Sequence, residues 1–294
     1  MGDNSYSLTR PLLTALRAAK DAGRAVLEVY NQEFDVWYKE DRSPLTAADQ
    51  SSHQIIVDHL NDPRIKSFPV LSEEGKDIPF EKRRKWKYFW LVDPLDGTKE
   101  FIKRNGEFTV NIALIYQHRP VLGVIYVPVK KCYYFATKDV GAYRLQYNEA
   151  DDVLDDDTVK SGEDEALDTV LKRSDRLPCD NIRSESSGTE LIIAGSRSHP
   201  SKEFEAFVEN MKKKYSNVEV VSSGSSLKLC LVAEGRADIY PRLGPTMEWD
   251  TAAGQAIVEQ AGGSVVNYES GKPLAYNKKN LLNPWFIVRS QRNS

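Results

Sequence analysis

The spacing of hydrophobic residues in the first half of the chain changes from helical to extended. Apolar residues three and four positions apart predict a long amphipathic helix from Leu8 to Tyr30 and a second helix at about 47–60. Short apolar runs at 34–39 and 68–71 predict strands. Past residue 106, β-branched and aromatic residues are interrupted by turn-forming residues, which predicts consecutive antiparallel strands at 107–116, 121–128, 132–137 and 140–147.

The second half has a different pattern, in which strand-like apolar runs alternate with helical periodicity. The expected elements are strands at 190–195, 218–221, 236–241, 264–266 and 285–289, and helices at about 200–214, 225–234 and 249–261. Alternation of this kind predicts the α/β fold class with mixed sheets. We therefore expect an α+β N-terminal half, residues 1–166, and an α/β C-terminal half, residues 167–294, with the site in the cleft between them.

Residues 148–166 interrupt both patterns. The segment is acidic and contains few large apolar residues, so it cannot bury enough surface to offset the entropy lost on ordering. It is predicted to be a mobile surface loop, and the sequence assigns it no purpose.

Charge and composition limit the partners of the protein. The 294 residues include 40 basic and 43 acidic side chains, a net charge of −3, so the chain as a whole does not attract nucleic acid or anionic membranes. A local basic run at 82–87 predicts a solvated loop, with substrate steering or contact with a membrane surface left open. Monomer and homodimer remain equally compatible with the sequence.

Export and stable membrane insertion are not predicted. The N-terminus lacks the charged and apolar regions of a signal peptide, and the apolar stretch from Val121 to Val129 is shorter than the roughly 20 residues of a membrane span. Three widely spaced cysteines, Cys132, Cys179 and Cys230, suggest no disulfide framework. These features predict a cytoplasmic protein, with peripheral attachment to the inner face of the cell membrane as the alternative.

The strongest chemical signal is the sequence DPLDGT, Asp93 to Thr98, which follows an apolar strand. Pro94 fixes the backbone angle φ and Gly97 permits conformations that other residues avoid, so two carboxylates lie on one rigid turn. Carboxylates grouped in this way bind hard cations, and Mg²⁺ is usually held by one or two carboxylates with water and phosphate oxygens. Taken alone, the same residues are also ordinary for a turn or a helix cap.

Three further acids lie at predicted element ends. Glu73 follows a strand, Asp250 opens the last helix, and Asp49 lies in the first turn of the second helix. A helix N-terminus alone explains Asp49 and Asp250, and Glu73 alone is compatible with a surface position. Convergence would change this interpretation. Two carboxylates about 4 Å apart repel by about 4 kcal/mol at an effective dielectric of 20, so four converging acids favour a bound cation.

Together these segments resemble the inositol monophosphatase superfamily of metal-dependent, lithium-sensitive phosphatases. The resemblance rests on the motifs SEEG, DPLDGT and WDTAAG, in that order. The segment that begins with GSSLK at Gly224 is similar to the bacterial CysQ type of 3′(2′),5′-bisphosphate nucleotidase within that superfamily. The likeness runs from LTAAD at 45–49 to LLNPWFIV at 281–288, with the acidic segment as an insertion. It implies a layered αβαβα sandwich.

The resemblance implies a metal and a mechanism. Two or three Mg²⁺ ions would be held by five ligands: the side chains of Glu73, Asp93, Asp96 and Asp250 and the carbonyl of Leu95. A water molecule activated by one ion would attack the phosphate directly in line, oriented and deprotonated by Thr98 and Glu73. Asp49 would support a third metal or water activation, and a second ion would stabilise the departing oxygen. Inhibition by Li⁺ is also implied.

Substrate contacts are expected at two further places. The amides of Gly97 and Thr98, at the start of a short helix, would receive phosphate oxygens. A second phosphate would be held by a group of hydroxyl and cationic side chains, namely Ser225, Ser226, Lys228 and Arg242. Ser196 and His199 would contact the ribose or the base. A helix cap at Ser225 and an exposed position for Lys228 are the structural alternatives.

The implied reaction is hydrolysis of the 3′-phosphate of adenosine 3′,5′-bisphosphate (PAP) to AMP and phosphate, with a role in sulfate assimilation. The sulfated nucleotide PAPS is a further candidate substrate. An inositol or sugar phosphate phosphatase with the same metal site is the nearest alternative. A nucleotide-binding sensor without turnover is the alternative of another class.

Overall fold

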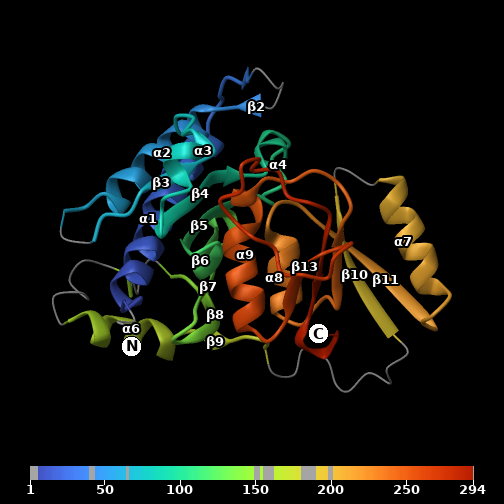
Figure 1. The fold of residues 1–294 in the computed structure, drawn as a ribbon. Coiled ribbons are helices and arrows are strands. Elements are labelled where there is room, and N and C mark those ends of the chain that lie inside the picture. The colour runs from blue at the N-terminus through green and yellow to red at the C-terminus, as the bar shows by residue number, and fades with distance from the viewer. Residues whose placement is uncertain are drawn as a thin grey trace.

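Two sheets alternate with three layers of helices in an αβαβα order (Figure 1). Helices α1 (Thr9–Tyr30) and α2 (Ala47–Leu60) cover one face of a seven-stranded sheet, whereas α8 (Leu227–Ala233) and α9 (Glu248–Gln260) lie between that sheet and a five-stranded one. Helix α7 (Lys202–Lys212) covers the outer face of the second sheet. The layered fold is as predicted. This computed structural model describes residues 6–39, 44–63, 66–148, 153–154, 162–179, 190–197 and 201–293.

The first sheet has the strand order β3–β4–β5–β6–β7–β8–β9. Strands β3 and β4 are parallel, and every later neighbouring pair is antiparallel. The strands are β3 (Val70–Ser72), β4 (Tyr88–Asp96), β5 (Thr109–Tyr116), β6 (Arg119–Val127), β7 (Cys132–Thr137), β8 (Gly141–Gln146) and β9 (Asp175–Arg176). The prediction of consecutive antiparallel strands between residues 107 and 147 is therefore confirmed.

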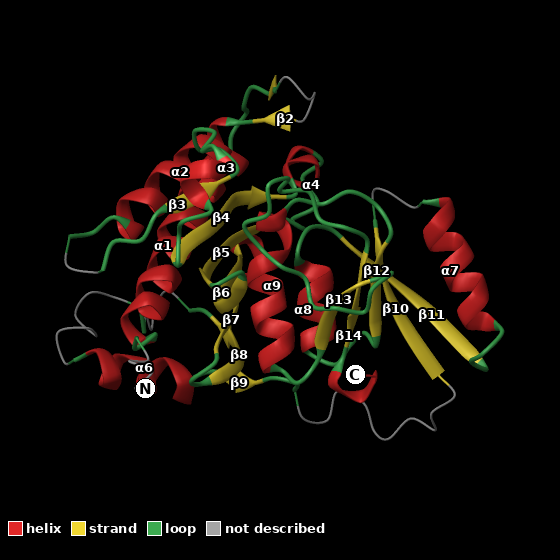
Figure 2. Cartoon of the chain, viewed as in Figure 1, coloured by secondary structure: helices red, strands yellow, loops and turns green. Residues whose placement is uncertain are grey.

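The second sheet is mixed, as Figure 2 shows beside the two central helices. Its order is β11–β10–β12–β14–β13, with β10 parallel to β11 and β12, and β14 antiparallel to β12 and β13. The strands are β10 (Glu190–Ser196), β11 (Asn217–Ser223), β12 (Ile239–Arg242), β13 (Ser264–Asn267) and β14 (Phe286–Arg289). The alternation of strands and helices predicted for this half is confirmed.

Glycines let α9 approach its neighbours closely. A Cβ atom added to Gly123 of β6 would lie 2.3 Å from the backbone oxygen of Ala253 in α9. A Cβ on Gly254 would lie 2.6 Å from the side chain of Leu229 in α8. Because any larger side chain would separate these elements, the small residues bring the first turn of α9, and with it Asp250, against the first sheet.

The acidic segment differs from its prediction. Among its described residues, Val153 and Leu154 are buried in the core that α1 forms with the first sheet. Helix α6 (Glu163–Lys172) begins before residue 166, and its Ala166 is buried in the same core. The prediction of a mobile surface loop is wrong at these places, because a few apolar side chains suffice to anchor the segment on α1. Residues 149–152 and 155–161 lie outside the described residues.

The expected boundary between the two halves, at residues 166 and 167, falls inside α6. Strand β9, which follows that helix, still pairs with β8 of the first sheet through Tyr143 and Arg176. The elements of the first half therefore continue to residue 176, and the second sheet begins with β10.

Short elements also depart from the predicted pattern. The strand expected at 34–39 is limited to β1 (Trp37–Tyr38), which pairs with β2 (Pro44–Leu45). The basic run begins within a short helix, α3 (Phe80–Arg83), and its basic side chains are exposed to solvent as predicted, except that of Arg83, which is buried. Its guanidinium donates to Asn277 Oδ1 at 2.8 Å and to the backbone oxygens of Lys278 and Lys279. One cation of this run therefore holds the C-terminal segment in place.

Within the described parts of the chain, the helices are all too short or too polar to cross a lipid bilayer. Cys132 and Cys230 are buried and Cys179 is partly exposed, and no disulfide joins these three described residues.

Candidate metal centre

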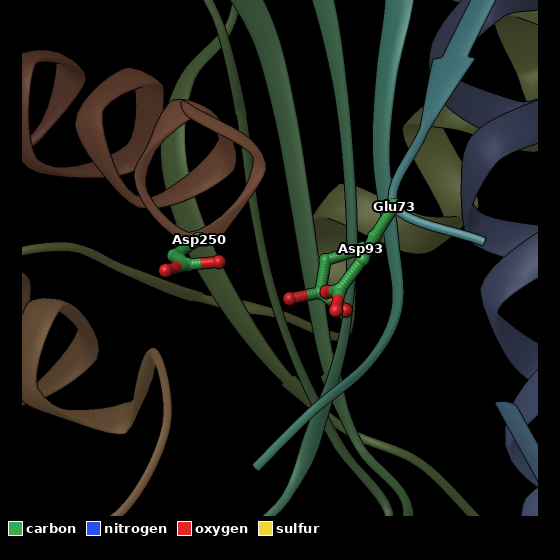
Figure 3. A group of neighbouring side chains, drawn as sticks. All are labelled: Glu73, Asp93 and Asp250. Atoms are coloured by element: carbon green, nitrogen blue, oxygen red, sulfur yellow. The ribbon is translucent and has the colours of Figure 1, made fainter. Parts of the chain in front are cut away.

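Three carboxylates from separate segments meet between the first sheet and α9 (Figure 3). Glu73 follows β3, Asp93 lies in β4, and Asp250 lies in the first turn of α9. One oxygen from each carboxylate lies within 4.8 Å of the others. Figure 3 shows Glu73 and Asp93 side by side, with Asp250 facing them from the helix. The predicted convergence of these three acids is confirmed.

The geometry of the DPLDGT segment depends on an irregularity in β4. The pairing of β4 with β5 shifts register between Asp93 and Asp96, where Pro94 interrupts the ladder. The carbonyl of Pro94 accepts a hydrogen bond from Ser52 Oγ at 2.6 Å, and the amide of Leu95 donates to Asp93 Oδ1 at 3.1 Å. The strand therefore bends at a fixed point and presents its two aspartates on one side.

Asp96 lies beside the cluster and is held by a hydroxyl group. Ser226 Oγ lies 2.6 Å from Asp96 Oδ2 and 3.0 Å from the backbone oxygen of Asp250. Asn111 Nδ2 donates to Ser226 Oγ at 2.8 Å and approaches Asp96 Oδ2 at 3.4 Å. Ser226 therefore links β4 to the start of α9. Ser226 was predicted to contact substrate, and its hydroxyl is hydrogen-bonded to Asp96, a predicted metal ligand.

Burial makes the carboxylates hard to ionise together. It raises the pKa of Asp93 and of Asp250 well above the usual range, and repulsion from the neighbouring carboxylates raises both further. Burial also raises the pKa of Glu73 and of Asp96, although Lys39 opposes the shift at Glu73 and Ser226 opposes it at Asp96. A divalent cation would remove this repulsion. The donor set consists of oxygen atoms, which fits a hard cation.

Lys39 supplies one positive charge at the edge of the cluster. Its Nζ lies 2.9 Å from Glu73 Oε1 and also contacts Glu74. Burial alone would lower the pKa of Lys39, but the two glutamates raise it. Sequence reasoning missed Lys39, since a lysine in a short extended segment carries no signal for a partner 34 residues away.

Asp49 and Thr98 form a second polar group next to the metal cluster. Asp49 is buried in the first turn of α2, where its Oδ2 accepts from the backbone amide and the hydroxyl of Thr46, both at 2.7 Å. Its Oδ1 accepts from Thr98 Oγ1 at 3.2 Å, and Thr98 Oγ1 lies 3.4 Å from the carbonyl of Leu95. Burial raises the pKa of Asp49, although the hydrogen bonds from Thr46 oppose the shift. The helix-cap role and contact with Thr98 therefore coexist in one side chain.

Gly97 occupies a backbone conformation that favours glycine. Its φ is +92°, and a Cβ atom would lie 3.1 Å from the backbone oxygen of Glu107 and 3.2 Å from Ser225 Cβ. Gly97 immediately precedes the short helix α4 (Thr98–Ile102). The turn can therefore approach the segment that carries Ser225.

A cavity of about 150 Å³ opens beside the metal cluster and includes Asp96 and Asp250 in its wall. Two polar atoms in its lining residues, Ser225 Oγ and Arg242 Nε, are buried without a hydrogen-bond partner among the described residues. Buried polar groups are normally satisfied, so these two donors suit a ligand that supplies acceptors. The structure brings Gly97, Ser196 and Lys228 to the same cavity.

Lys228 is buried beneath the turn that carries Ser225. Its Nζ donates to the backbone oxygens of Ser223 and Ser225, at 3.1 and 2.7 Å, which leaves one of its three donor hydrogens for another acceptor. Burial lowers the pKa of Lys228 to about 8, although Asp96 opposes the shift. The alternative of an exposed surface lysine is wrong, because only 4% of the residue is exposed.

A second cavity, of about 380 Å³, shares Ser196, Tyr240 and Arg242 with the first. Its other lining residues are mainly apolar: Phe204, Pro241, Leu243, Gly244 and Pro245, together with Lys99 and Ser201. His199, predicted to contact the ribose or the base, lies outside the described residues. Sequence reasoning also missed Asn111, which a polar position inside the apolar strand β5 could have revealed.

Comparisons with known proteins agree with this arrangement. The Inositol monophosphatase family matches residues 8–286 of the chain. The chain is 42% identical over 274 residues to the 3′(2′),5′-bisphosphate nucleotidase CysQ of Escherichia coli (strain K12), covering 92% of this chain and 96% of that protein. A crystal structure of CysQ from Bacteroides thetaiotaomicron is 48% identical, with a TM-score of 0.83, and the match covers 97% of this chain and 98% of that one.

A more distant relative shares the fold alone. The inositol monophosphatase from Anabaena is 23% identical, with a TM-score of 0.67 and coverage of 97% of this chain and 93% of that one. The residues that match the Inositol monophosphatase family include the whole acidic cluster and nearly all of both sheets. The chain therefore belongs to the inositol monophosphatase family, whose members are metal-dependent enzymes.

Proposed function

We propose that the protein is a 3′(2′),5′-bisphosphate nucleotidase that hydrolyses the 3′-phosphate of PAP to AMP and phosphate. One observation carries the choice of substrate: a single cavity beside the acidic cluster is lined both by carboxylates and by donors that lack a partner among the described residues. Asp96 and Asp250 line the same space as Ser225, Lys228 and Arg242. A substrate with two phosphates would place one at the metals and the other at these donors. Curated relatives that match most of the chain bear this activity in their names.

The metal would be Mg²⁺, in two or three sites. Glu73, Asp93 and Asp250 would hold it with Asp96 and the carbonyl of Leu95, since carboxylate and carbonyl oxygens are the ligands this ion prefers. When bound, the ions supply positive charge that favours ionisation of water and neutralises the phosphate and the departing oxygen. The remaining steps depend on side chains of the protein.

Thr98 and Asp49 would control the attacking water together with Glu73. Because Thr98 Oγ1 donates its proton to Asp49 Oδ1, its lone pairs can accept a hydrogen bond from water. The water would transfer its proton through Thr98 to Asp49 or directly to Glu73. The water would attack in line with the ribose oxygen, without a covalent phosphoenzyme. The amides of Gly97 and Thr98 would orient the phosphate.

The remainder of the nucleotide would occupy the two connected cavities. Lys228, Ser225 and Arg242 would hold the 5′-phosphate, and the apolar second cavity would receive the base, with Ser196 between them. PAPS, which carries a sulfate on the 5′-phosphate, would be a further substrate. Such an activity would remove PAP during sulfate assimilation.

An inositol or sugar phosphate would use the same metal cluster but leave the second set of donors without a partner. Phosphate release from PAP and from inositol 1-phosphate, measured with Mg²⁺ and again with a chelator, tests the proposal. We expect a higher kcat/KM for PAP and no release with the chelator. Faster turnover of the inositol ester would reject the nucleotide, and tight PAP binding without any phosphate release would indicate a sensor.

Lithium offers a separate test of the metal assignment. We expect Li⁺ at millimolar or lower concentrations to inhibit phosphate release, because a monovalent ion in a Mg²⁺ site supplies too little charge for the departing oxygen. Titration of the enzyme with LiCl, with KCl as the control salt, measures this. Equal effects of the two salts would contradict the expectation.

A further inference from the structure

A carboxylate outside the metal cluster holds the turn that carries the proposed phosphate-binding serines. Glu107 lies between α4 and β5, and its Oε2 accepts a hydrogen bond from the backbone amide of Gly224 at 2.8 Å. Gly224 begins the turn between β11 and α8, which continues with Ser225 and Ser226. The contact therefore joins the first half of the chain to a turn in the second half.

Arg197 completes this contact. Its Nε lies 2.7 Å from Glu107 Oε2, and its Nη2 lies 2.8 Å from Glu107 Oε1, so the carboxylate is held by a planar fork. The same Nη2 donates to the backbone oxygen of Ser222 at 2.9 Å. Arg197 thus orients the carboxylate and fastens it to the end of β11.

The turn is closely packed and strained. A Cβ on Gly224 would lie 2.8 Å from the backbone oxygen of Glu107 and 3.0 Å from its Cβ. The next residue, Ser225, has a φ of +42°, which a serine adopts only at a cost in free energy. Such a conformation persists only where neighbouring groups restrain the backbone, and the hydrogen bond from the Gly224 amide to Glu107 restrains the residue just before Ser225.

The charge of Glu107 argues for a role in geometry. A carboxylate close to a phosphate site would repel the ligand, but the carboxylate of Glu107 forms an ion pair with the guanidinium of Arg197, which offsets its charge. Glu107 is not among the residues that line the cavity, so it acts through the turn rather than by contact with substrate. Its effect would reach Ser225 and Lys228, whose Nζ donates to the Ser225 carbonyl.

We infer that Glu107 is a positioning residue that fixes the Gly224–Ser226 turn and thereby sets the affinity for the second phosphate of the substrate. The identity of that phosphate rests on the function proposed above. Arg197 supports Glu107, but the hydrogen bond to Gly224 carries the effect.

Three variants and one control separate this role from that of a general structural ion pair. Glu107→Ala removes the acceptor for Gly224, Glu107→Gln keeps an oxygen there, and Arg197→Ala removes only the support. Glu205→Ala, the same change at an exposed site on α7, is the control. Circular dichroism and the melting temperature report folding for each variant.

For Glu107→Ala we expect the KM for PAP to rise about tenfold with kcat within about twofold, and the KM for adenosine 3′-monophosphate to change little. Glu107→Gln and Arg197→Ala should each raise the KM for PAP by less than about threefold, because the bond to Gly224 survives. Equal changes for both substrates, or equal effects of Glu107→Ala and Arg197→Ala, would overturn the inference. If Glu107→Ala does not fold, Glu107→Met, which keeps the length of the side chain but has no carboxylate oxygen to accept from Gly224, takes its place with the same expected and contradicting results.

Titration with AMP, which retains the 5′-phosphate, tests the turn without turnover. We expect calorimetry to show binding to the wild type and about tenfold weaker binding to Glu107→Ala. Equal affinities, or no binding of AMP to the wild type, would overturn the inference. A wild type that binds AMP in this way but releases no phosphate from PAP would reject the proposed function and leave the role of Glu107 intact.

Discussion

The two ends of the proposed substrate site carry charges of opposite sign, and burial makes both charges unfavourable. At one end, Glu73, Asp93 and Asp250 crowd negative charge that burial makes costly. At the other end, Lys228 brings a buried positive charge and Arg242 a partly buried one, and two donor atoms lack a partner among the described residues. The acidic end therefore favours the binding of cations, and the other end favours the binding of an anion. A substrate that carries phosphates and recruits divalent metal satisfies both, which is a more specific requirement than either end imposes alone.

The largest effect is expected from neutralising the acidic end. Asp96→Asn preserves volume but removes one charge from the metal site, so we expect kcat/KM for PAP to fall by about 10²–10³-fold or more. Phosphate release at saturating Mg²⁺ measures this loss, and circular dichroism checks that the fold is unchanged.

Asp139→Asn makes the same change on an exposed turn between β7 and β8 and serves as the control. Near-normal turnover by Asp96→Asn would remove Asp96 from the metal ligands.

Truncation at the cationic end should act on binding rather than on chemistry. Lys228→Ala removes a buried cation from the proposed 5′-phosphate site, and we expect the KM for PAP to rise by about ten- to a hundredfold. The KM for a nucleoside 3′-monophosphate, which has no group at that position, should change far less. Steady-state kinetics with the two substrates measures the difference.

Lys214→Ala, at an exposed position after α7, is the matched control. If Lys228→Ala affected both substrates equally, Lys228 would support the fold of the cavity without reading the second phosphate.

The sequence predicted the acidic end better than the cationic end, for a physical reason. Glu73 and Asp250 lie at the ends of regular elements, and Asp93 lies where β4 becomes irregular beside Pro94, so local periodicity and turn residues mark all three positions. The contacts that position the turn with the two serines join distant residues. Ser226 reaches Asp96 across 130 positions of sequence, and Glu107 reaches Gly224 across 117. Such pairs form only when the N-terminal and C-terminal halves of the chain pack together, and the local spacing of residues in the sequence does not reveal that packing.

The same reasoning accounts for the elements. Long amphipathic segments such as α1 and α2 were predicted within one or two residues, since their buried faces repeat over several turns. The two-residue strand β9 and the helix α6 were not predicted. Pairing with β8 defines β9, and packing on α1 stabilises α6, so neither is determined by its own sequence alone.

Two adjacent serines offer a finer comparison of the two ends. Ser226 holds Asp96, whereas the hydroxyl of Ser225, a residue of the cavity wall, has no partner in the part of the chain that the structure describes. We expect Ser226→Ala to raise the Mg²⁺ concentration for half-maximal activity by about tenfold, as loss of a group that orients a metal ligand does. Ser225→Ala should leave this concentration unchanged and raise the KM for PAP instead. Metal titrations and substrate titrations of both variants measure the two effects, and identical behaviour of the two would contradict the division.

The smallest effect concerns stability of the metal-free protein. Burial raises the pKa of Asp93 and Asp250 in the folded state, so the folded protein binds more protons than the unfolded chain between the usual carboxyl pKa and the raised values. The free energy of unfolding therefore falls as pH rises through this window and is greatest below it, as far as these two groups contribute. We expect the melting temperature with a chelator to rise as pH is lowered from 7 towards 5, by about 2–4 °C for each 1 kcal/mol gained in the free energy of unfolding.

Asp250→Asn should flatten this dependence of the melting temperature on pH, and Mg²⁺ should reduce it in the wild type, because a bound cation keeps the carboxylates ionised. A melting temperature that instead falls over this range in the chelated wild type, by the same amount as in Asp250→Asn, would mean that repulsion within the cluster does not limit its stability.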